Sequence, residues 1–449
     1  MTLYHYYRTN IRGGNVSTTY NILVLGSGGR EHALVWKIAQ SPLCGRLYCA
    51  PPLGGSNGGL ADNVVCTPLD HTNPEAVIAF CQSHKIGLVV IGPEAPLVAG
   101  LADALTAAAI PTFGCSKEAA RLEGSKAYTK EVCDAASIPT AAYAHFTNAN
   151  AAHDYIATQT CPIVIKADGL AAGKGVVIAE TATAAHSAID DMFGGAFGAA
   201  GAEIVIEEFM EGEEASFFVL CDGTYAMPLA SAQDHKRVGD GDTGANTGGM
   251  GAYSPATIIT PTLTQEIMAR IINPTLKTMA ARGVPYRGVL YAGLMLTPDG
   301  IKLIEYNCRF GDPECQVLML RMKSDIVPLL LGCAIGGLQD MVCEWHGEPA
   351  LTLVMAAKGY PADYKKGTPI HIPQDASGGD ENVVIFHAGT ARDAAGDLIA
   401  NGGRVLNITA RGEDIRVARD AAYAAAKKIN WADGFYRNDI GAKELGRRR

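Results

Sequence analysis

The sequence of 449 residues lacks several features that would assign a class of protein at once. Its twelve cysteines include no C-x-x-C pair, so we expect reduced thiols in a cytosolic protein. No run of about 18 apolar residues occurs, which excludes a membrane-spanning helix. Basic residues are also in the minority, with 37 Lys plus Arg against 46 Asp plus Glu and a net charge of −9. This balance argues against a chain that mainly neutralises nucleic acid or an anionic membrane.

Glycine is the residue in surplus, with 51 positions in the chain, well above the usual share of about 7%. The hydrophobic content of 48% is ordinary for a globular protein, so collagen and low-complexity disorder are excluded. We expect the extra glycines in loops where the backbone comes close to a ligand or to another segment. At roughly 150 residues per domain, the length predicts about three domains.

The order of apolar and helical segments predicts three successive regions. From residue 21 to about 120, strand-like runs alternate with helical stretches, which is typical of a parallel α/β domain. Between residues 162 and 306, pairs of strands are joined without room for a helix, which predicts an antiparallel α+β region. After Gly332, three strand-like runs precede an alanine-rich helix at 415–429. Residues 1–20 lack an apolar signal core, and we expect them to form a disordered extension.

The first glycine-rich loop, GSGGRE at residues 26–31, follows a hydrophobic strand and opens a helix. Backbone N–H groups in this setting hold phosphates, and Arg30 could assist them. A dinucleotide site is disfavoured, because Glu31 replaces the third glycine and the second strand (47–50) ends without an acid for a ribose hydroxyl. A phosphate site and a tight turn without a ligand both remain open.

Glu94 stands in a second loop of the same domain, GPEAPL at residues 92–97. The loop follows a strand, at the edge where open α/β sheets bind ligands. Glu94 could pair with a cationic or hydroxylated ligand, and an ordinary proline-bounded turn is the alternative.

The second glycine-rich loop, at residues 167–175, resembles a P-loop but fails its pattern. Asp168 stands where the first glycine belongs, and Gly175 replaces the hydroxyl that binds magnesium. A strand rather than a helix follows. We interpret the loop as a hairpin lid whose N–H groups and Lys174 close over nucleotide phosphates, with Lys166 as a fixed charge on the preceding strand.

Acidic residues crowd the end of the next strand, IVIEEFMEGEE at residues 204–214. Surface charge is the ordinary explanation. The functional alternative is that the edge at Glu207–Met210 reads an adenine while Glu214 accepts hydrogen bonds from ribose hydroxyls.

A later strand carries the pattern of a metal site. Side chains at alternate positions of a strand share a face, so Glu305, Asn307 and Arg309 are predicted to line up. Two oxygen donors beside a cation suit Mg²⁺ bound to a polyphosphate. A solvated strand face is the alternative.

A polar, glycine-rich stretch at residues 233–251 begins with QDHKR. A stretch this long inside a compact protein is usually functional or disordered. Adjacent acidic, imidazole and basic groups at 233–237 favour a functional role.

Together these segments resemble ATP-grasp ligases, and more narrowly the glycinamide ribonucleotide synthetase (phosphoribosylamine–glycine ligase) family. The resemblance runs from Asn21 to about Gly441. It is carried by long literal strings: GGREHA (28–33), GPEAPLV (92–98), EGSK (123–126), IKADGLAAGKG (165–175), QDHKR (233–237), NTGGMGAY (246–253), NCRFGDPE (307–314) and RNDIG (437–441).

The resemblance implies a role for each matched residue. ATP would be bound by Lys126, Lys166, Gly173, Lys174, Gly175, Glu207, Glu208, Phe209 and Glu214. The substrates would contact Gly28, Gly29, Arg30, Glu31, Glu94, Asp234, His235, Lys236 and Arg309. Of these, Arg309, Lys236 and Lys174 would be catalytic, while Glu305 and Asn307 would ligate Mg²⁺ or Mn²⁺.

The family's reaction is ATP-dependent. Glycine's carboxylate attacks the γ-phosphate, and the amine of 5-phosphoribosylamine attacks the resulting glycyl phosphate. Phosphoryl transfer needs positioning and charge neutralisation more than a covalent nucleophile, and an acyl phosphate must be kept from water, which suits a lid.

The implied architecture is a multidomain α/β and α+β protein. We expect an unmatched extension at 1–20, a Rossmann-like parallel-sheet domain at 21–122, an ATP-grasp domain at 123–331 with its lid at about 140–208, and a small C-terminal α/β domain at 332–449. Only small-molecule partners are expected, in a cytoplasmic monomer or weak dimer.

Three alternatives stay open. Another ATP-grasp ligase would share Lys166, the lid and Glu305 but differ at 233–251, a nucleotide-binding oxidoreductase would use the first loop, and an inactive binding protein would keep the fold. One departure from the family pattern is the loop at 51–59, PPLGGSNGG, which puts its substrate contacts in doubt.

Overall fold

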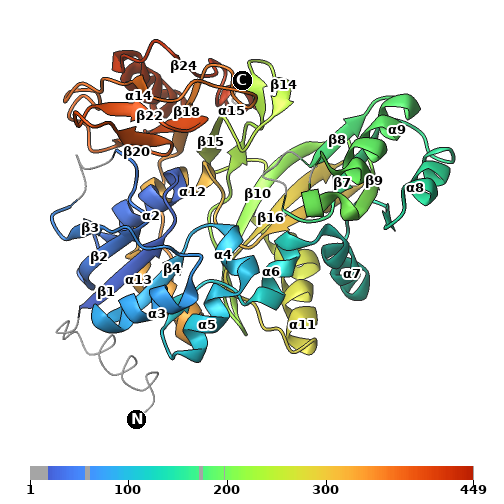
Figure 1. Cartoon of the computed structure of the whole chain (residues 1–449), viewed down its shortest axis with the longest axis horizontal. Coiled ribbons are helices and arrows are strands. Elements are labelled where there is room, and N and C mark those ends of the chain that lie inside the picture. The colour runs from blue at the N-terminus through green and yellow to red at the C-terminus, as the bar shows by residue number, and fades with distance from the viewer. Residues whose placement is uncertain (1–18, 56–60, 171–174, 197, 448–449) are drawn as a thin grey trace.

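The computed structural model describes residues 19–55, 61–170, 175–196 and 198–447. The expected extension at 1–20 therefore lies almost wholly outside the described residues. In Figure 1 the N-terminal sheet and the C-terminal sheet lie on one side of the molecule, and the predicted lid projects on the other. None of the described helices is long and apolar enough to cross a bilayer.

The N-terminal domain is a parallel sheet of five strands in the order β3-β2-β1-β4-β5. The chain order reverses between β1 and β4, so the loops after these two strands border the crevice where such sheets bind ligands. The strands are β1 (Tyr20–Leu25), β2 (Cys44–Ala50), β3 (Val64–Cys66), β4 (Ile86–Ile91) and β5 (Thr112–Phe113), and the helices are α2 (Gly29–Ile38), α3 (Pro74–Ser83), α4 (Glu94–Ala99) and α5 (Leu101–Ala107).

Two short helices lead from this domain into an antiparallel lid subdomain. Its sheet has the order β6-β9-β7-β8, and a hairpin joins β7 to β8, as expected from the absence of a helix between them. The elements are α6 (Lys117–Gly124), α7 (Lys126–Ala136), β6 (Tyr143–Phe146), α8 (Ala149–Ile156), β7 (Ile163–Ala167), β8 (Val176–Ala179), α9 (Ala182–Asp191) and β9 (Ile204–Glu208).

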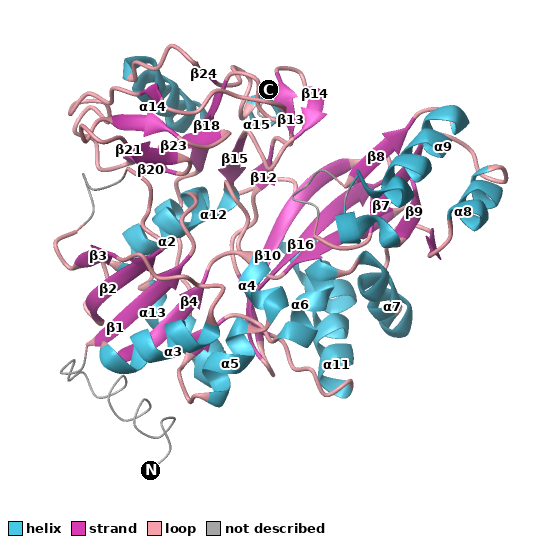
Figure 2. Ribbon diagram, viewed as in Figure 1, coloured by secondary structure: helices cyan, strands magenta, loops and turns pink. Residues whose placement is uncertain are grey.

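A second antiparallel sheet, in the order β11-β10-β16-β17, runs between the lid and the N-terminal domain (Figure 2). Its edge strand β17 carries the predicted metal face. The elements are β10 (Glu213–Asp222), β11 (Ala226–Pro228), α10 (Pro261–Ile267), α11 (Asn273–Ala281), β16 (Arg287–Thr297), β17 (Gly300–Asn307), α12 (Glu314–Arg321) and α13 (Ile326–Ile335).

The C-terminal sheet is built from two distant parts of the chain, in the order β12-β15-β18-β23-β20 with β24 beside β18. The polar stretch at 233–251 begins with β12, also contains β13 and β14, and leads into β15, so it is ordered structure and not a free loop. The elements are β12 (Gln233–Asp234), β13 (Arg237–Gly239), β14 (Thr243–Asn246), β15 (Gly251–Ser254), β18 (Ala350–Ala357), β20 (Val383–His387), β23 (Arg404–Arg411), α14 (Ile415–Lys428), β24 (Gly434–Phe435) and α15 (Ala442–Arg447); a small sheet, β19 (Thr368–Pro369), β21 (Thr390–Arg392) and β22 (Leu398–Ala400), lies beside them.

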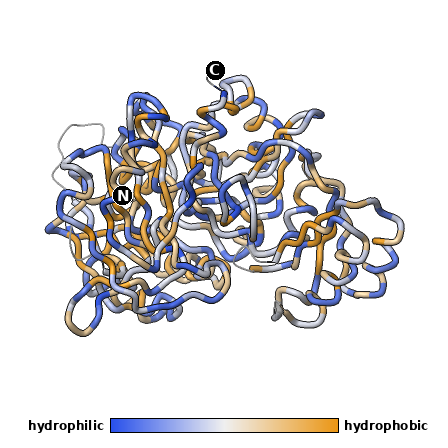
Figure 3. The backbone as a smooth tube through the Cα atoms, turned by 90° about the horizontal axis from the view of Figure 1, so that it is seen from above, coloured by the Kyte–Doolittle hydropathy of each residue, from blue (hydrophilic) through white to orange (hydrophobic). Residues whose placement is uncertain are grey.

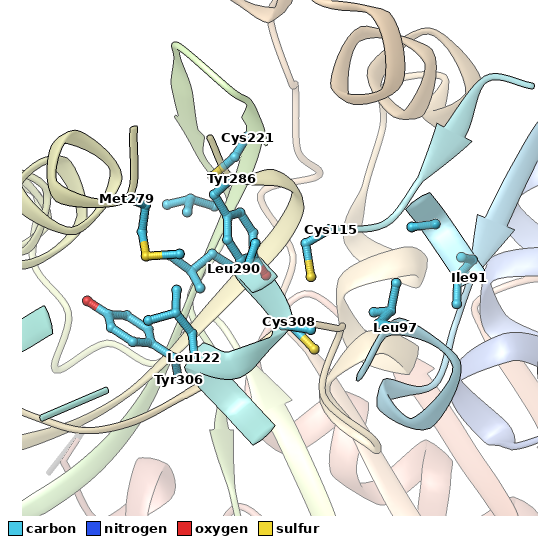
Figure 4. Packing of buried hydrophobic residues seen from close by; sticks show 14 of the residues in the cluster. Ile91, Leu97, Cys115, Leu122, Cys221, Met279, Tyr286, Leu290, Tyr306 and Cys308 are labelled. Carbon is cyan, nitrogen blue, oxygen red and sulfur yellow. The ribbon is translucent and has the colours of Figure 1, made fainter. Parts of the chain in front are cut away.

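The parts of the protein share buried cores. One core joins the N-terminal sheet to the central sheet: Ile91 and Leu97 pack toward Cys115 and Cys308, and these toward Tyr286 and Leu290 (Figure 4). Hydrophobic stretches run through the interior strands while many polar stretches follow the outer loops (Figure 3). Because apolar burial is the main stabilising term in folding, this continuity fixes the N-terminal loops relative to the central sheet.

Candidate active site

Buried charges at the base of the lid form a lysine–glutamate cluster, defined by Lys126, Lys130, Lys166 and Glu207. Lys166 Nζ on β7 lies 2.7 Å from Glu207 Oε2 on β9, and Lys130 Nζ on α7 lies 3.1 Å from Glu207 Oε1. The three side chains are only 2–5% exposed. Burial raises the pKa of Glu207, but the charges of Lys166 and Lys130 outweigh it and hold that pKa below its ordinary value. Glu207 is therefore an anion that keeps both ammonium groups in place.

The hairpin base is tied to the start of α7. Lys126 Nζ donates to the carbonyl of Gly169 at 3.1 Å. Asp168 accepts from the Ser125 hydroxyl at 2.9 Å and from the Ala127 N–H at 3.0 Å. Asp168, the residue that departs from the P-loop pattern, therefore caps the N-terminus of α7. Lys126, at the start of that helix, contacts the base of the hairpin. Gly173 and Lys174 lie outside the described residues, whereas Gly175 closes the hairpin by accepting from the Ala167 N–H at 2.8 Å.

The residues predicted to bind adenosine differ in their contacts and exposure. The Glu207 carboxylate is occupied by two lysines, Glu208 accepts from Lys302 Nζ at 2.7 Å, and Glu214 pairs with Lys236. Phe209 is 38% exposed. The structure therefore leaves the Phe209 ring and the adjoining backbone edge as the open surface, and the Glu207 carboxylate is not part of it.

A central cluster, defined by Glu214, Asp234, Lys236, Glu305 and Glu314, draws its side chains from β10, β12 and the residues after it, β17 and α12. Lys236 interacts electrostatically with Glu214, Asp234 and Glu305. Burial lowers the pKa of Lys236, but these acids outweigh it and hold the pKa well above its ordinary value. Burial raises the pKa of Asp234 to about 7, with Glu314 and Glu214 adding to the rise.

Glu314, which had no assigned role, begins α12 and is almost fully buried. Its Oε1 accepts from the Tyr291 hydroxyl at 2.9 Å and from the Ser216 hydroxyl at 3.3 Å. The central cluster is therefore rich in carboxylate oxygens around one lysine, which suits an ammonium ligand.

The residues present fit a divalent cation at β17. Glu305 and Asn307 share a strand face, as predicted, and no described side chain donates a hydrogen bond to either one. Two oxygen donors, with Lys126 interacting electrostatically with Glu305, match the way Mg²⁺ is held in proteins, with few protein ligands and the rest from phosphate and water. Among the described residues no group of three or more His, Cys, Asp or Glu is arranged to hold a metal ion, so a cation here needs oxygen atoms from a ligand.

The prediction that Arg309 continues this strand face is wrong, because β17 ends at Asn307. Arg309 belongs instead to an arginine–glutamate cluster, defined by Arg30, Glu31, Glu94, Glu123 and Arg309. Its Nη2 lies 3.0 Å from Glu123 Oε1, and its Nε lies 3.4 Å from Glu94 Oε2. Burial lowers the pKa of Arg309, but the acids outweigh it and raise that pKa above its ordinary value.

Arg30 completes this cluster from the first glycine loop. Its Nε lies 2.6 Å from Glu31 Oε1, and its Nη1 lies 4.0 Å from Glu94 Oε2. Glu94 therefore stands between two guanidinium groups from opposite ends of the chain, at the crevice between β1 and β4.

The first glycine loop is packed around a carboxylate. The Gly28 N–H donates to Glu31 Oε2 at 2.7 Å, so one donor of the predicted phosphate site already has a partner. A Cβ at Gly92 would stand 2.3 Å from Glu31 Oε1, and one at Gly29 would stand 2.1 Å from Asn407 Nδ2. The close backbone approach expected from the glycine surplus is confirmed at these two positions.

His235 does not join the predicted substrate residues. Alternation along the chain turns it away from Asp234 and Lys236, and its Nε2 accepts from the Gly441 N–H at 3.3 Å. The ring is buried, and burial lowers its pKa to about 4. The side chain contacts the C-terminal segment, so it supports the loop and does not line the cleft.

Sequence reasoning missed Lys130, Glu123 and Arg404. Lys130 follows Lys126 by four residues on one helix, and this spacing could have identified it. Glu123 lies in the matched string EGSK, but its position in that string does not indicate a role. Arg404, whose Nη1 donates to the Gly248 carbonyl at 2.6 Å and whose Nη2 lies 3.2 Å from Asp312 Oδ2, had no signal at all.

Comparisons with known proteins agree with this geometry. Models of phosphoribosylglycinamide synthetase match the chain in order, its N domain at residues 20–123, its ATP-grasp (A) domain at 124–315 and its C domain at 350–443. The phosphoribosylamine–glycine ligase of Rhizobium meliloti (strain 1021) is 57% identical over 426 residues, which cover 95% of this chain and 99% of that protein. The chloroplastic phosphoribosylamine–glycine ligase of Arabidopsis thaliana is 52% identical over 93% of this chain and 79% of its own length.

Solved structures give the same result. The crystal structure of phosphoribosylamine–glycine ligase from Thermotoga maritima matches with a TM-score of 0.82 and 33% identity, covering 94% of this chain and all of that one. The biotin carboxylase domain of a 2-oxoglutarate carboxylase from Hydrogenobacter thermophilus has a TM-score of 0.71 at 16% identity, covering 94% and 92% of the two chains, and shares the fold alone.

The fold and the matching domain model define an ATP-grasp enzyme. Within that class, the chain belongs to the phosphoribosylglycinamide synthetase family. The predicted family and fold class are confirmed.

Proposed function

We propose that the three clusters form one active site, which joins glycine to the amine of 5-phosphoribosylamine. The chain is an ADP-forming carbon–nitrogen ligase of purine biosynthesis. The observation that carries the assignment of the site is the position of Glu305, which interacts electrostatically with Lys126 on one side and with Lys236 on the other. Glu305 thus links the lysine–glutamate cluster to the central cluster.

ATP binds along the lysine–glutamate cluster. Lys126 and Lys166 neutralise its phosphate oxygens, and Lys130 with Glu207 holds Lys166 at a fixed point. Three lysines against one glutamate give this cluster a net positive charge, as a triphosphate requires. The Phe209 edge faces the adenine, and the lid loop with Lys174 closes over the phosphates.

Glu305 and Asn307 hold Mg²⁺ or Mn²⁺ when the nucleotide is bound. The cation supplies neutralisation of charge on the transferring phosphoryl group. Buried lysines beside these two oxygen donors support this assignment.

Glycine binds at the central cluster. Asp234 and Glu314 accept hydrogen bonds from its ammonium group, while Lys236 and Arg309 orient its carboxylate. A carboxylate oxygen then attacks the γ-phosphorus, and the bond to the β-phosphate oxygen breaks to release ADP. The amine of phosphoribosylamine attacks the carbonyl carbon of the glycyl phosphate, inorganic phosphate leaves, and the amine loses a proton.

Phosphoribosylamine binds at the arginine–glutamate cluster. Arg30 attracts its phosphate, while Glu31 and Glu94 accept from its hydroxyl and amine groups. The location of this cluster at the β1–β4 crevice supports the assignment. We also propose that the enzyme works as a monomer or weak dimer in the cytoplasm, which sedimentation and cell fractionation would test.

The test is release of ADP that depends on both glycine and freshly generated phosphoribosylamine. We expect release only when both are present. Release with a different carboxylate or amine in place of this pair would instead support another ATP-grasp ligase.

A further inference from the structure

Two cysteines outside the three clusters face each other in the N-terminal sheet. Cys49 on β2 and Cys66 on β3 are directly paired in two parallel strands, and their Sγ atoms lie 3.0 Å apart. Neighbouring strands are about 4.8 Å apart, and disulfides accept Cα separations of about 4.4–6.8 Å. The two sulfurs could therefore be joined with little movement of the backbone.

The two thiols differ in access. Cys49 is fully buried, whereas Cys66 lies on the edge strand β3 and is partly exposed. The hydrogen bond from Cys49 lowers the pKa of Cys66 to about 6. Since the thiolate is the nucleophile in disulfide exchange, Cys66 is reachable and reactive, and Cys49 can be reached from Cys66.

Other thiols of the protein lack this combination. Cys115 and Cys308 approach each other in the core (Figure 4), but both are buried, so a reagent cannot enter. Cys44, at the start of β2, is partly exposed, yet burial raises its pKa to about 11. Its sulfur contacts the Asn63 amide rather than a second thiol.

We propose that Cys49 and Cys66 are a redox modification site that forms a reversible disulfide with low-molecular-weight disulfides such as oxidised glutathione. The Cys66 thiolate attacks one sulfur of oxidised glutathione and releases one glutathione thiolate. Cys49 then attacks Sγ of Cys66, its proton passes to the departing glutathione sulfur, and the second glutathione leaves as a thiol. Two protein thiols are oxidised and one glutathione disulfide is reduced to two thiols.

The bond would join the carboxyl ends of β2 and β3, beside the residues that follow β2. Leu53, one of these residues, has a backbone hydrogen bond to the thiol pair, and the Gly55 N–H donates to Thr390 Oγ1 at 3.1 Å. The disulfide would therefore link β3, at the edge of the N-terminal sheet, to β2, close to the contact between the N-terminal and C-terminal domains.

The experiment treats the folded full chain with oxidised glutathione, blocks the remaining thiols after denaturation, and maps peptides without reduction. We expect two of the twelve thiols to be lost and one peptide pair to be linked through Cys49 and Cys66. Dithiothreitol should restore both thiols.

Two variants make the test specific. Cys49→Ser should leave Cys66 as a stable glutathione adduct with no linked peptide, while the matched control Cys44→Ser should form the link as the wild type does. Full retention of both thiols in the treated wild type, or a link from Cys66 to any other cysteine, would overturn the proposal.

Discussion

The lysine–glutamate cluster and the arginine–glutamate cluster use the same kind of ion pair for opposite purposes. In the first, Lys130, Lys166 and Glu207 are sealed from water at 2–5% exposure. In the second, only the Arg309–Glu94 pair is open, with 20% and 30% of the side chains exposed, because Arg30, Glu31 and Glu123 are only 2–9% exposed. Buried pairs cannot change partners without a large desolvation cost, whereas the open pair can exchange a partner for a ligand.

Their net charges also have opposite sign. The lysine–glutamate cluster has three lysines against one glutamate, and the arginine–glutamate cluster has two arginines against three glutamates. The proposed triphosphate site is therefore the positive cluster, and the proposed phosphoribosylamine site is the negative one. Burial and net charge, more than residue type, therefore distinguish the two clusters.

We expect the largest effect at Glu305, which links the lysine–glutamate cluster to the central cluster. Glu305→Ala should lower turnover by about 10²–10³-fold, comparable to the loss of one electrostatic contact to a transition state, while unfolding remains cooperative. Steady-state ADP release at several Mg²⁺ concentrations measures this. Asp299→Asn, at an exposed acid in the turn before β17, is the control. Wild-type turnover in Glu305→Ala would refute the metal assignment.

Next in size is the loss of one lysine from the buried cluster. Lys166→Met and Lys130→Met each leave Glu207 with one partner, and each should cost about 1.5–3 kcal/mol of unfolding free energy, the range for a hydrogen bond to a charged group. Only Lys166→Met should also raise the KM for ATP strongly, because Lys130 serves to position it. Urea unfolding measures the loss of stability in each variant, and steady-state kinetics measures its KM for ATP. Equal KM values in the two variants would show that both lysines have the same role.

A smaller effect on turnover is expected at Glu123 in the arginine–glutamate cluster. Glu123 Oε2 accepts from the Cys308 N–H at 2.8 Å while its Oε1 pairs with Arg309. Glu123→Ala should lower kcat about 10²-fold, as expected for a misplaced catalytic group, with the KM for ATP unchanged, and Glu123→Gln should recover part of the loss. Glu118→Gln on the same helix is the control, and a change in the KM for ATP alone would argue against a positioning role.

The smallest effect concerns pH. Because the pKa of Asp234 is raised to about 7, its carboxylate is protonated below that pH and cannot pair with the glycine ammonium. The value of kcat/KM for glycine should therefore rise about tenfold per pH unit up to about pH 7, as a single titration requires, and level off above it. Asp234→Asn should remove this rise of kcat/KM with pH. If the variant keeps the same pH profile, the titrating group is not Asp234.

Much of the fold could be predicted from local patterns. The alternation before residue 120 predicted the parallel sheet, and the absence of helix-forming sequence between 166 and 176 predicted the hairpin. Strand alternation correctly placed Glu305 beside Asn307. These signals are local, because they depend on the period of a strand or helix and on turn residues.

The remaining contacts of the candidate site could not be predicted from local patterns, because they join segments that are distant in the sequence. Arg30 donates to the carbonyl of Phe310, 280 residues away, and no local pattern states which acid Arg309 meets once its strand has ended. The strands β12 and β15 joined the C-terminal sheet because pairing satisfies their backbone groups, and His235 was turned out of the cleft by the same pairing.

The sequence by itself determined the class of chemistry, through its glycine loops, its oxygen donors on one strand face and its matched strings. Only the tertiary structure decided which charges are buried together, and hence which carboxylates are occupied and which are open. The physical reason is that burial sets the strength of each ion pair, and burial depends on every part of the chain that packs around it.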